Sequence, residues 1–284
     1  RDMAEMMVGA VLTPPARAAR KEWPETAPAL EVAALSVDSP IPFGTSLKNI
    51  SFAVRRGEIL GIAGVAGNGQ DELLLALSGE LRSSPEMVKT FDTPVGALGP
   101  NDRRKLGFVA APEDRLGHAA APDMSLVENA LLSGDVRMEL TKNGFIDWAK
   151  TRAWAERIVE QYDVRTPGTW VAARALSGGN LQKFLMGREL SQSPDIIVIN
   201  QPTWGVDASA AAFIRQEILD RAEEGAAVVV ISQDLDDLLE VSDRFAAMNE
   251  GRMTDPRPTE GLTVDEIGMM MGGAHGMEVS HHVA

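Results

Sequence analysis

The sequence predicts an α/β fold with a parallel β-sheet at its centre. Two continuous apolar runs rich in Val and Ile, 195–201 and 225–233, are typical of strands buried on both faces of such a sheet. Between them, residues 209–224 have the apolar spacing of a crossover helix. A third apolar run, 57–63, leads through a glycine-rich stretch into a helical pattern at 73–80. A strand–loop–helix start followed by a later βαβ unit defines this class of fold.

The other segments complete this organisation along the chain. Residues 10–28 are rich in Pro and Ala and are expected to form a linker. Segments 29–37, 47–54 and 106–111 have the composition of short strands. Over residues 124–173 the apolar residues recur three and four positions apart, which predicts helices. We therefore expect one α/β domain that carries two smaller subdomains.

The C-terminal part, 256–284, is expected to hold a short helix and a flexible tail. Thr-Val-Asp-Glu at 263–266 forms a capping box for that helix. The segment 265–272 also matches residues 2–9, with four of eight positions identical. We interpret residues 1–9 as the end of a preceding copy of the same domain. The alternative is two unrelated Met-rich helix ends that need only apolar packing. Since the first residue is Arg1, we expect the natural start to lie further upstream.

Composition excludes several classes of protein. The chain has 284 residues, 44% of them apolar and 24% charged, which is enough for a large core and ordinary for a globular protein. Its net charge of −14 argues against nucleic acid as a partner, because there is no basic excess to neutralise phosphates. The absence of cysteine excludes disulfides and thiolate chemistry, and no apolar run approaches the roughly 20 residues of a membrane span.

The glycine-rich stretch at 64–73 has the spacing of a phosphate-binding loop. Such a loop reads G-x-x-x-x-G-K-[ST] between a strand and a helix, and its backbone N–H groups hold phosphate. Here Gln70 replaces the lysine, Asp71 replaces the hydroxyl residue, and a second acid follows, so both acids are expected at the mouth of the loop. The candidate nucleotide-binding residues are Gly64, Gly67, Asn68, Gly69, Gln70, Asp71 and Glu72.

Three further motifs follow in a fixed order. Leu-Ser-Gly-Gly-Asn at 176–180 precedes the apolar run at 195–201, that run leads into Asn-Gln-Pro-Thr-Trp-Gly-Val-Asp at 200–207, and the next run ends at Ser232. Over about residues 28–255 the chain resembles the ATP-binding cassette of ABC transporters. The resemblance implies a P-loop NTPase-like parallel-sheet core, an N-terminal antiparallel β subdomain and a helical subdomain at about 115–175. It gives a nucleotide-binding domain at 29–255, with ATP and Mg²⁺ as cofactors.

The resemblance also implies that the catalytic groups of this site are altered. Asn200 and Gln201 match the family's magnesium-supporting aspartate and its catalytic glutamate, and Gln233 matches the switch histidine. An amide cannot accept a proton from the attacking water, so we predict poor hydrolysis at this site. Two interpretations stay open. In one, nucleotide binds weakly, with Asp71 and Asn200 as candidate Mg²⁺ ligands; in the other, the site is empty and the acids only stabilise the helix N-terminus.

The signature segment keeps the family's pattern. In ABC cassettes this segment closes over the ATP of the partner cassette, and the helix N-terminus that it opens suits an anion. Asp207 matches the aspartate that contacts the partner across the dimer interface. The signature residues are Ser177, Gly178, Gly179, Asn180 and Gln182.

Several single residues carry less specific expectations. Glu113 or Ala111 occupies the position of the family's glutamine near the metal, and Phe43 is the candidate for stacking on adenine. Core packing is the expectation for three tryptophans, Trp148, Trp154 and Trp170. No metal or triad arrangement is expected from His118, which is isolated in the sequence, or from His275, His281 and His282 in the tail.

Taken together, the resemblance implies the energy-coupling subunit of a bacterial importer for nucleosides or simple sugars. Its partners would be the N-terminal cassette of the same polypeptide, the membrane permease subunits and, indirectly, a substrate-binding protein. It would lie on the cytoplasmic face of the inner membrane and act as an ATPase in the complete dimer, with the isolated half weak or inactive. The alternatives are a pentose-type sugar importer and a coupling module that binds no nucleotide. A soluble cassette acting on ribosomes or DNA is disfavoured by the acidic charge.

Overall fold

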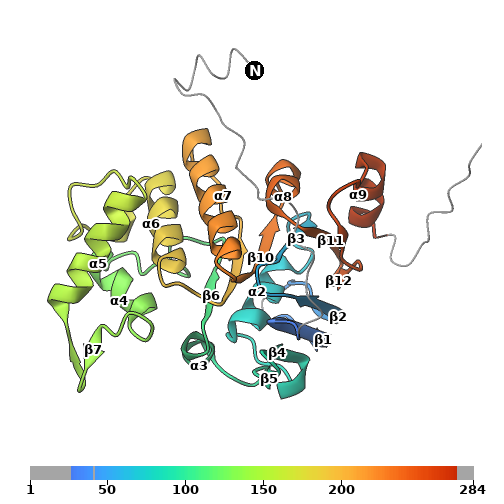
Figure 1. The fold of residues 1–284 in the computed structure, drawn as a ribbon, viewed down its shortest axis with the longest axis horizontal. Helices are drawn as coiled ribbons and strands as arrows, with labels where there is room; N and C mark the ends of the chain where they lie inside the picture. Colours follow the sequence, from blue (N-terminus) through green and yellow to red (C-terminus); the bar gives the residue numbers. More distant parts are fainter. Residues whose placement is uncertain (1–26, 41, 274–284) are drawn as a thin grey trace, which may run out of the picture.

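A mostly parallel seven-stranded sheet forms the centre of the chain in a computed structural model that describes residues 27–40 and 42–273 (Figure 1). The strand order is β12-β11-β3-β10-β9-β6, with β13 paired to β11, and the four pairings from β11 to β6 are parallel. This confirms the predicted α/β class. Its strands are β3 (Ile59–Gly64), β6 (Phe108–Ala111), β9 (Ile196–Asn200), β10 (Ala227–Ser232), β11 (Arg244–Asn249), β12 (Arg252–Met253) and β13 (Arg257–Pro258).

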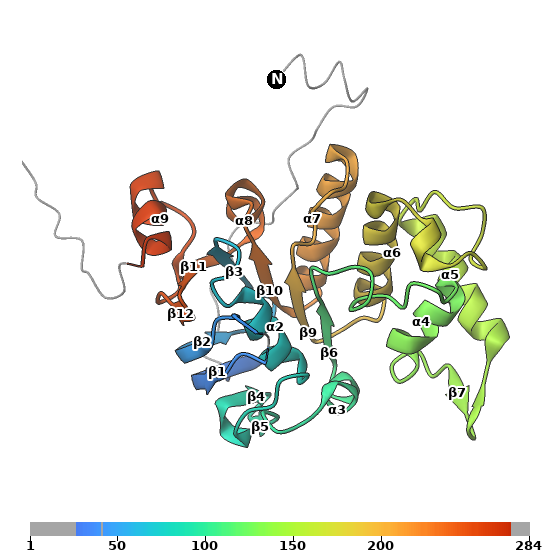
Figure 2. The same cartoon turned by 180° about the vertical axis from the view of Figure 1, so that it is seen from behind.

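Both faces of this sheet are covered, as its continuous apolar strands require. Ile59, Ile197 and Val228 point into a core shared with α6, α7 and α8. Their neighbours Leu60 and Val229 point to the opposite face, which is covered by α2 and a second sheet. Figures 1 and 2 show these two sides of the molecule. The covering helices are α2 (Gln70–Ser78), α6 (Gly178–Leu190), α7 (Ala208–Glu223) and α8 (Leu235–Val241).

The second sheet is antiparallel and has the order β2-β1-β4-β5. It contains both strands expected at the start of the domain, so the predicted antiparallel β subdomain is present. A one-turn 3₁₀ helix (Pro85–Met87) precedes β4, and α3 (Pro100–Lys105) leads back to β6. The strands of this second sheet are β1 (Leu30–Val37), β2 (Leu47–Val54), β4 (Val88–Thr90) and β5 (Thr93–Pro94).

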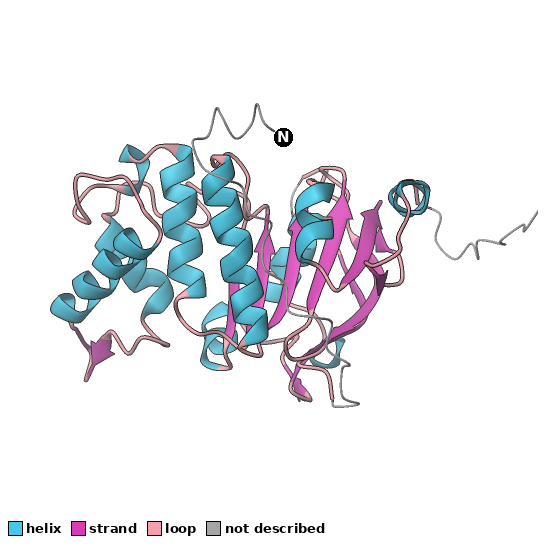
Figure 3. Ribbon diagram, turned by 45° about the horizontal axis from the view of Figure 1, so that its top comes forward, coloured by secondary structure: helices cyan, strands magenta, loops and turns pink. Residues whose placement is uncertain are grey.

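A helical region lies at the other end of the molecule from the two sheets (Figure 3). It contains α4 (Leu126–Gly134), α5 (Trp148–Gln161), a β7–β8 hairpin (Thr141–Lys142 and Phe145–Ile146) and a short 3₁₀ turn (Ala173–Ala175) that leads to α6. A Ser125–Glu128 capping box starts α4. The helices predicted over residues 124–173 are confirmed for α4 and α5, whereas the β7–β8 hairpin between them was not predicted.

Only one of the three tryptophans is in the core. Trp154 is buried against Gly134, where a Cβ would lie 2.1 Å from the ring. The prediction was wrong for Trp148 and Trp170, which are 47% and 73% exposed. Trp148 is the first residue of α5, before the buried positions of that helix begin, and Trp170 lies in a loop with its ring against the backbone of Gly168.

The C-terminal helix α9 (Val264–Met271) packs on β11 through Ile267 and Met270. Thr263 and Glu266 form the capping box that the sequence predicts. Some predictions lie outside the described residues. They concern residues 1–9, the linker except for its last two residues, and the tail with its three histidines. No helix in the described part of the chain combines the length and apolar character that a membrane span requires.

Candidate functional site

The candidate site lies where β3, β9 and β10 end side by side. The parallel register sets Asn200 opposite Ile231, and Ser232 opposite Ala63. The glycine-rich loop after β3 therefore meets the residues that follow the other two strands, as at the ligand-binding edge of open α/β sheets. A cavity of about 30 Å³ lies between them and is lined by Ala66, Gly67, Gln70, Asp71, Glu113, Asn200, Gln201, Ile231, Ser232 and Gln233.

Gln70 fills its own loop. Its Nε2 donates to the carbonyl of Val65 at 2.9 Å, and its Oε1 accepts from the backbone N–H of Asn68 at 3.0 Å. The residue is only 7% exposed, and a Cβ on Gly64 would lie 2.4 Å from Nε2. One N–H group of the kind that binds phosphate in such loops is thus already bonded to a side chain of the protein.

The loop is also held from outside. Gly67 and Gly69 have φ angles of 84° and 105°, which other residues rarely adopt. The Thr45 hydroxyl donates to the Gly67 carbonyl at 2.6 Å. Asn68 accepts two further bonds: its side-chain Oδ1 from the Glu250 N–H, and its backbone carbonyl from the Gly251 N–H. The shape of a phosphate loop is therefore fixed by the rest of the fold.

The two acids after the loop point in different directions. Glu72 is buried, and its Oε1 accepts from the Ser39 hydroxyl at 2.8 Å and the Thr45 N–H at 2.9 Å. The expectation that it lines the mouth of the loop was wrong, because it anchors the preceding segment to α2. Asp71 does face the site and accepts from Asn200 Nδ2 at 2.9 Å. Partial burial, and then Glu72, raise the pKa of Asp71.

These residues do not form a ready magnesium site. The Asp71 oxygen that faces Asn200 is engaged by its amide, which offers a donor there rather than a metal ligand. No cluster of three or more His, Asp or Glu side chains within the described residues is placed to hold a metal ion. Asp71 and Asn200, the two predicted ligands, therefore bond to each other and form no preformed Mg²⁺ centre.

The amide residues at the predicted catalytic positions differ in their surroundings. Gln201 is buried, has a φ of 55°, and accepts from the Ser232 hydroxyl at 3.2 Å through Oε1. Gln233 is exposed at the opening of the same cavity. Glu113 lines the cavity while Ala111 ends β6 and is buried, so Glu113 is the residue of the linking segment that meets the site. Burial, and then Asp71, raise the pKa of Glu113.

The signature residues lie at the N-terminus of α6. They face Asp71 and Glu113 across an open cavity of about 810 Å³. Ser177 is the N-cap residue, but its hydroxyl accepts from Asn180 Nδ2 at 2.9 Å and from no backbone N–H of the helix. A Cβ on Gly179 would lie 3.2 Å from the carbonyl of Gly205, so the signature and the next loop pack closely. Gln182 is buried and donates to the carbonyl of Pro202 at 2.8 Å, which ties α6 to the end of β9.

Two predicted contact residues have clear places in the fold. Asp207 caps α7 by accepting from the Ala210 N–H at 2.9 Å, and this bond lowers its pKa. The residue is exposed, so its capping role leaves it at the surface. Phe43 is fully exposed, two residues before Thr45, which holds the loop.

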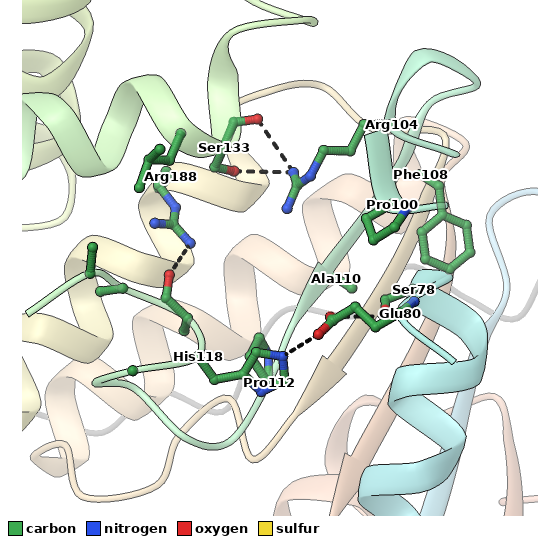
Figure 4. Close-up of a pocket in the computed structure, with 15 residues that line it drawn as sticks. Ser78, Glu80, Pro100, Arg104, Phe108, Ala110, Pro112, His118, Ser133 and Arg188 are labelled. Carbon is green, nitrogen blue, oxygen red and sulfur yellow. Dashed lines mark hydrogen bonds and ion pairs between the residues drawn. The ribbon is translucent and has the colours of Figure 1, made fainter. Parts of the chain in front are cut away.

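A histidine and its partner were missed by the sequence analysis. His118 Nε2 lies 2.8 Å from Glu80 Oε2, a pairing that the sequence analysis did not predict. Figure 4 shows the pair at one side of a cavity of about 270 Å³, with Arg104 and Ser133 hydrogen-bonded at the other. The two partners are 38 residues apart, and no sequence pattern connects them.

The pair should make stability depend on pH. The bond to Glu80 raises the pKa of His118 above 6.5, with Asp114 and Asp71 adding to the shift, and the bond to His118 lowers the pKa of Glu80 below 4.5. The raised histidine pKa stabilises the fold fully below pH 6.5, and this is lost as the pH rises through the raised value. The lowered Glu80 pKa stabilises it above pH 4.5 and is lost as the pH falls.

His118→Gln should therefore reduce Tm most at about pH 5.5 and least at about pH 8.5. Thermal denaturation of both chains across this range measures the difference. Glu80→Gln should give the same dependence of Tm on pH as His118→Gln. A difference in Tm that stays constant with pH would show that the ion pair does not contribute to stability.

Comparisons with known proteins agree with this geometry. The family model described as ABC transporter matches residues 47–204. The nucleoside import ATP-binding protein NupA of Lactococcus lactis is 34% identical over 97% of this chain and 54% of its own length. The glucose import ATP-binding protein TsgD13 of Haloferax volcanii is 39% identical over 80% of this chain and 42% of its own length. The chain thus spans about half the length of these relatives.

A solved structure shows the same fold. The ATP-binding subunit of an ABC transporter superposes with a TM-score of 0.68 at 19% identity, over 86% of this chain and 99% of that one. One assignment follows from three observations: the order of the motifs, their meeting at one edge of the sheet, and the family-model match over more than half of the chain. The chain belongs to the ABC transporter family and has the fold of its ATP-binding cassettes.

Proposed function

We propose that this chain is a cassette with a degenerate nucleotide site in an ABC importer, and that it supplies its signature to the ATP site of a partner cassette. The observation that carries the proposal is the self-filled loop. Gln70 bonds to Val65 and Asn68 at 2.9 and 3.0 Å, where the family has a phosphate-binding lysine. Asn200, Gln201 and Gln233 stand at the other catalytic positions, and none of them can act as a general base.

The partner-facing side supports the same proposal. The first turn of α6 has no side-chain cap, which leaves its N–H groups for an anion outside this chain. Trp204, beside that turn, is 61% exposed, and Asp207, three residues later in the chain, is exposed as well. A cassette that has lost its own catalytic groups but keeps this face can still serve the site of a partner.

The proposed partner is a preceding cassette in the same polypeptide. The match between residues 2–9 and 265–272 supports this arrangement, and so does the half-length coverage of the relatives. In this division, residues 1–9 end the first cassette, 10–28 link the two, 29–255 form the second cassette and 256–284 follow it. The helical subdomain at about 115–175 would contact the permease at the cytoplasmic face of the membrane.

Nucleosides or simple sugars are the proposed cargo. NupA is named for nucleoside import, and TsgD13 for glucose import. A pentose-type sugar is the alternative within this class, and substrate choice would reside in the permease and the binding protein. Uptake of a radiolabelled nucleoside and of ribose into cells that carry the complete transporter distinguishes them.

Calorimetric titration of the chain with Mg-ATP, with phosphate release followed in the same sample, tests the degenerate site. We expect no binding below about 1 mM, which corresponds to roughly 4 kcal/mol of binding free energy, and no phosphate release. Micromolar binding without turnover would instead make the site a structural nucleotide clamp. Turnover by the isolated chain would contradict the assignment of Gln201 as a disabled catalytic position.

A further inference from the structure

Arg115 lies between the signature and the loop that follows β9. It belongs to the linking segment 112–118 after β6, and its Nη2 donates to the carbonyl of Trp204 at 2.8 Å. A Cβ on Gly178 would lie 2.8 Å from Nη1, and one on Gly205 would lie 2.9 Å from Nη2. The guanidinium therefore packs directly on the backbone of both partner-facing segments, and the two glycines leave the room for it.

Most donors of this guanidinium remain available. Among the residues that the structure describes, its one hydrogen bond goes to Trp204, whereas a guanidinium carries five N–H donors. Arg115, Gly178 and Trp204 line the open cavity of about 810 Å³. The unused donors thus adjoin the uncapped first turn of α6, and a planar cation beside free N–H groups suits a phosphate.

The surrounding charges make this arginine decisive. Asp71, Glu113 and Asp114 line the same cavity, as does His118, which is paired with Glu80; Arg115 is the one Lys or Arg among its described lining residues. A highly charged anion that approaches this face meets three carboxylates. Without Arg115, electrostatic repulsion at this face would oppose the anion that the signature is expected to contact.

We propose that Arg115 is a phosphate-binding residue that acts in trans, contacting the terminal phosphate of the nucleoside triphosphate held by the partner cassette. This inference rests on the proposed function, in which the signature completes the partner's site. It adds a residue from the linking segment to that site. Because the same segment leads into the helical region, Arg115 also connects that region to the nucleotide.

The test uses the complete transporter and measures kcat and KM for ATP hydrolysis together with Tm. Arg115→Gln removes the charge but keeps a donor for the Trp204 carbonyl, and we expect kcat to fall about 100-fold at an unchanged Tm. Arg115→Lys keeps the charge without the planar fork and should recover part of kcat. Arg174→Ala is the matched control, because Arg174 is exposed and pairs with Asp123 at 2.8 Å; it should leave kcat unchanged.

A Ser177→Asp variant of the same transporter separates the two proposals. If Ser177→Asp abolishes hydrolysis while Arg115→Gln keeps wild-type kcat, the inference about Arg115 is overturned and the proposed function survives. If Ser177→Asp is harmless, the proposed function itself fails. If the loss of kcat in the Arg115→Gln and Arg115→Lys chains only follows their loss of Tm, Arg115 is a structural brace and the inference is overturned.

Discussion

Ser177→Asp is expected to reduce ATP hydrolysis by the complete transporter at least 100-fold without unfolding the chain. Aspartate is as good an N-cap residue as serine, so α6 should form normally. Its carboxylate would, however, stand where the phosphate of the partner's ATP is expected. Two like charges about 4 Å apart at an effective dielectric near 20 repel by roughly 4 kcal/mol, or about a thousandfold in affinity.

The measurement is steady-state phosphate release by purified transporter, with Tm recorded for each variant. Ser125→Asp is the control for a carboxylate at a helix N-cap position, since Ser125 is the N-cap residue of α4 and lies outside the signature, although its hydroxyl, unlike that of Ser177, accepts from a helix N–H. It should leave hydrolysis unchanged. Wild-type hydrolysis by the Ser177→Asp transporter would mean that this signature contacts no phosphate.

Gln70→Lys is expected to strengthen Mg-ATP binding by this chain at least tenfold. The change removes the amide that bonds Val65 and Asn68, which leaves the Asn68 N–H with its longer bond of 3.3 Å to the Val65 carbonyl, and restores a cation. A unit charge at about 4 Å from phosphate is worth at most about 4 kcal/mol at this effective dielectric, and Asp71 at the loop offsets part of it. Hydrolysis should remain absent, because Gln201 cannot accept a proton.

Calorimetry on the two chains measures this effect. Gln161→Lys, at the exposed end of α5, changes the net charge equally and should leave binding as in the wild type. Equal affinities for the Gln70→Lys and Gln161→Lys chains would show that the loop is closed to phosphate for reasons other than Gln70.

Features that depend on neighbouring residues in the chain were predictable. The buried strands β9 and β10 follow from continuous apolar runs, and the Thr263–Glu266 box from a spacing of three. The position of the loop follows from its glycines. Its chemistry does not, because Gln70 could equally have pointed outward, and only the packed loop shows that it bonds Val65.

Contacts between distant segments were not predictable. His118 and Glu80 are 38 residues apart, and Arg115 and Trp204 are 89 apart. Nothing in the composition around either residue indicates its partner, since topology alone brings the segments together. The exposure of Trp170 was missed for a related reason. Tryptophan is buried on average, but this average does not predict the exposure of a tryptophan in a particular surface loop.

The self-filled loop has a consequence for how this cassette responds to the energy state of the cell. A protein that binds ATP at 100 times its Kd gains about 2.7 kcal/mol of stability from the ligand, and loses it when ATP is depleted. In this chain, Gln70, Thr45 and Asn68 hold the loop in shape without nucleotide. Under the proposed function, in which this chain binds no ATP, its folding free energy does not depend on the ATP concentration, and the signature stays folded for the partner even when ATP is depleted.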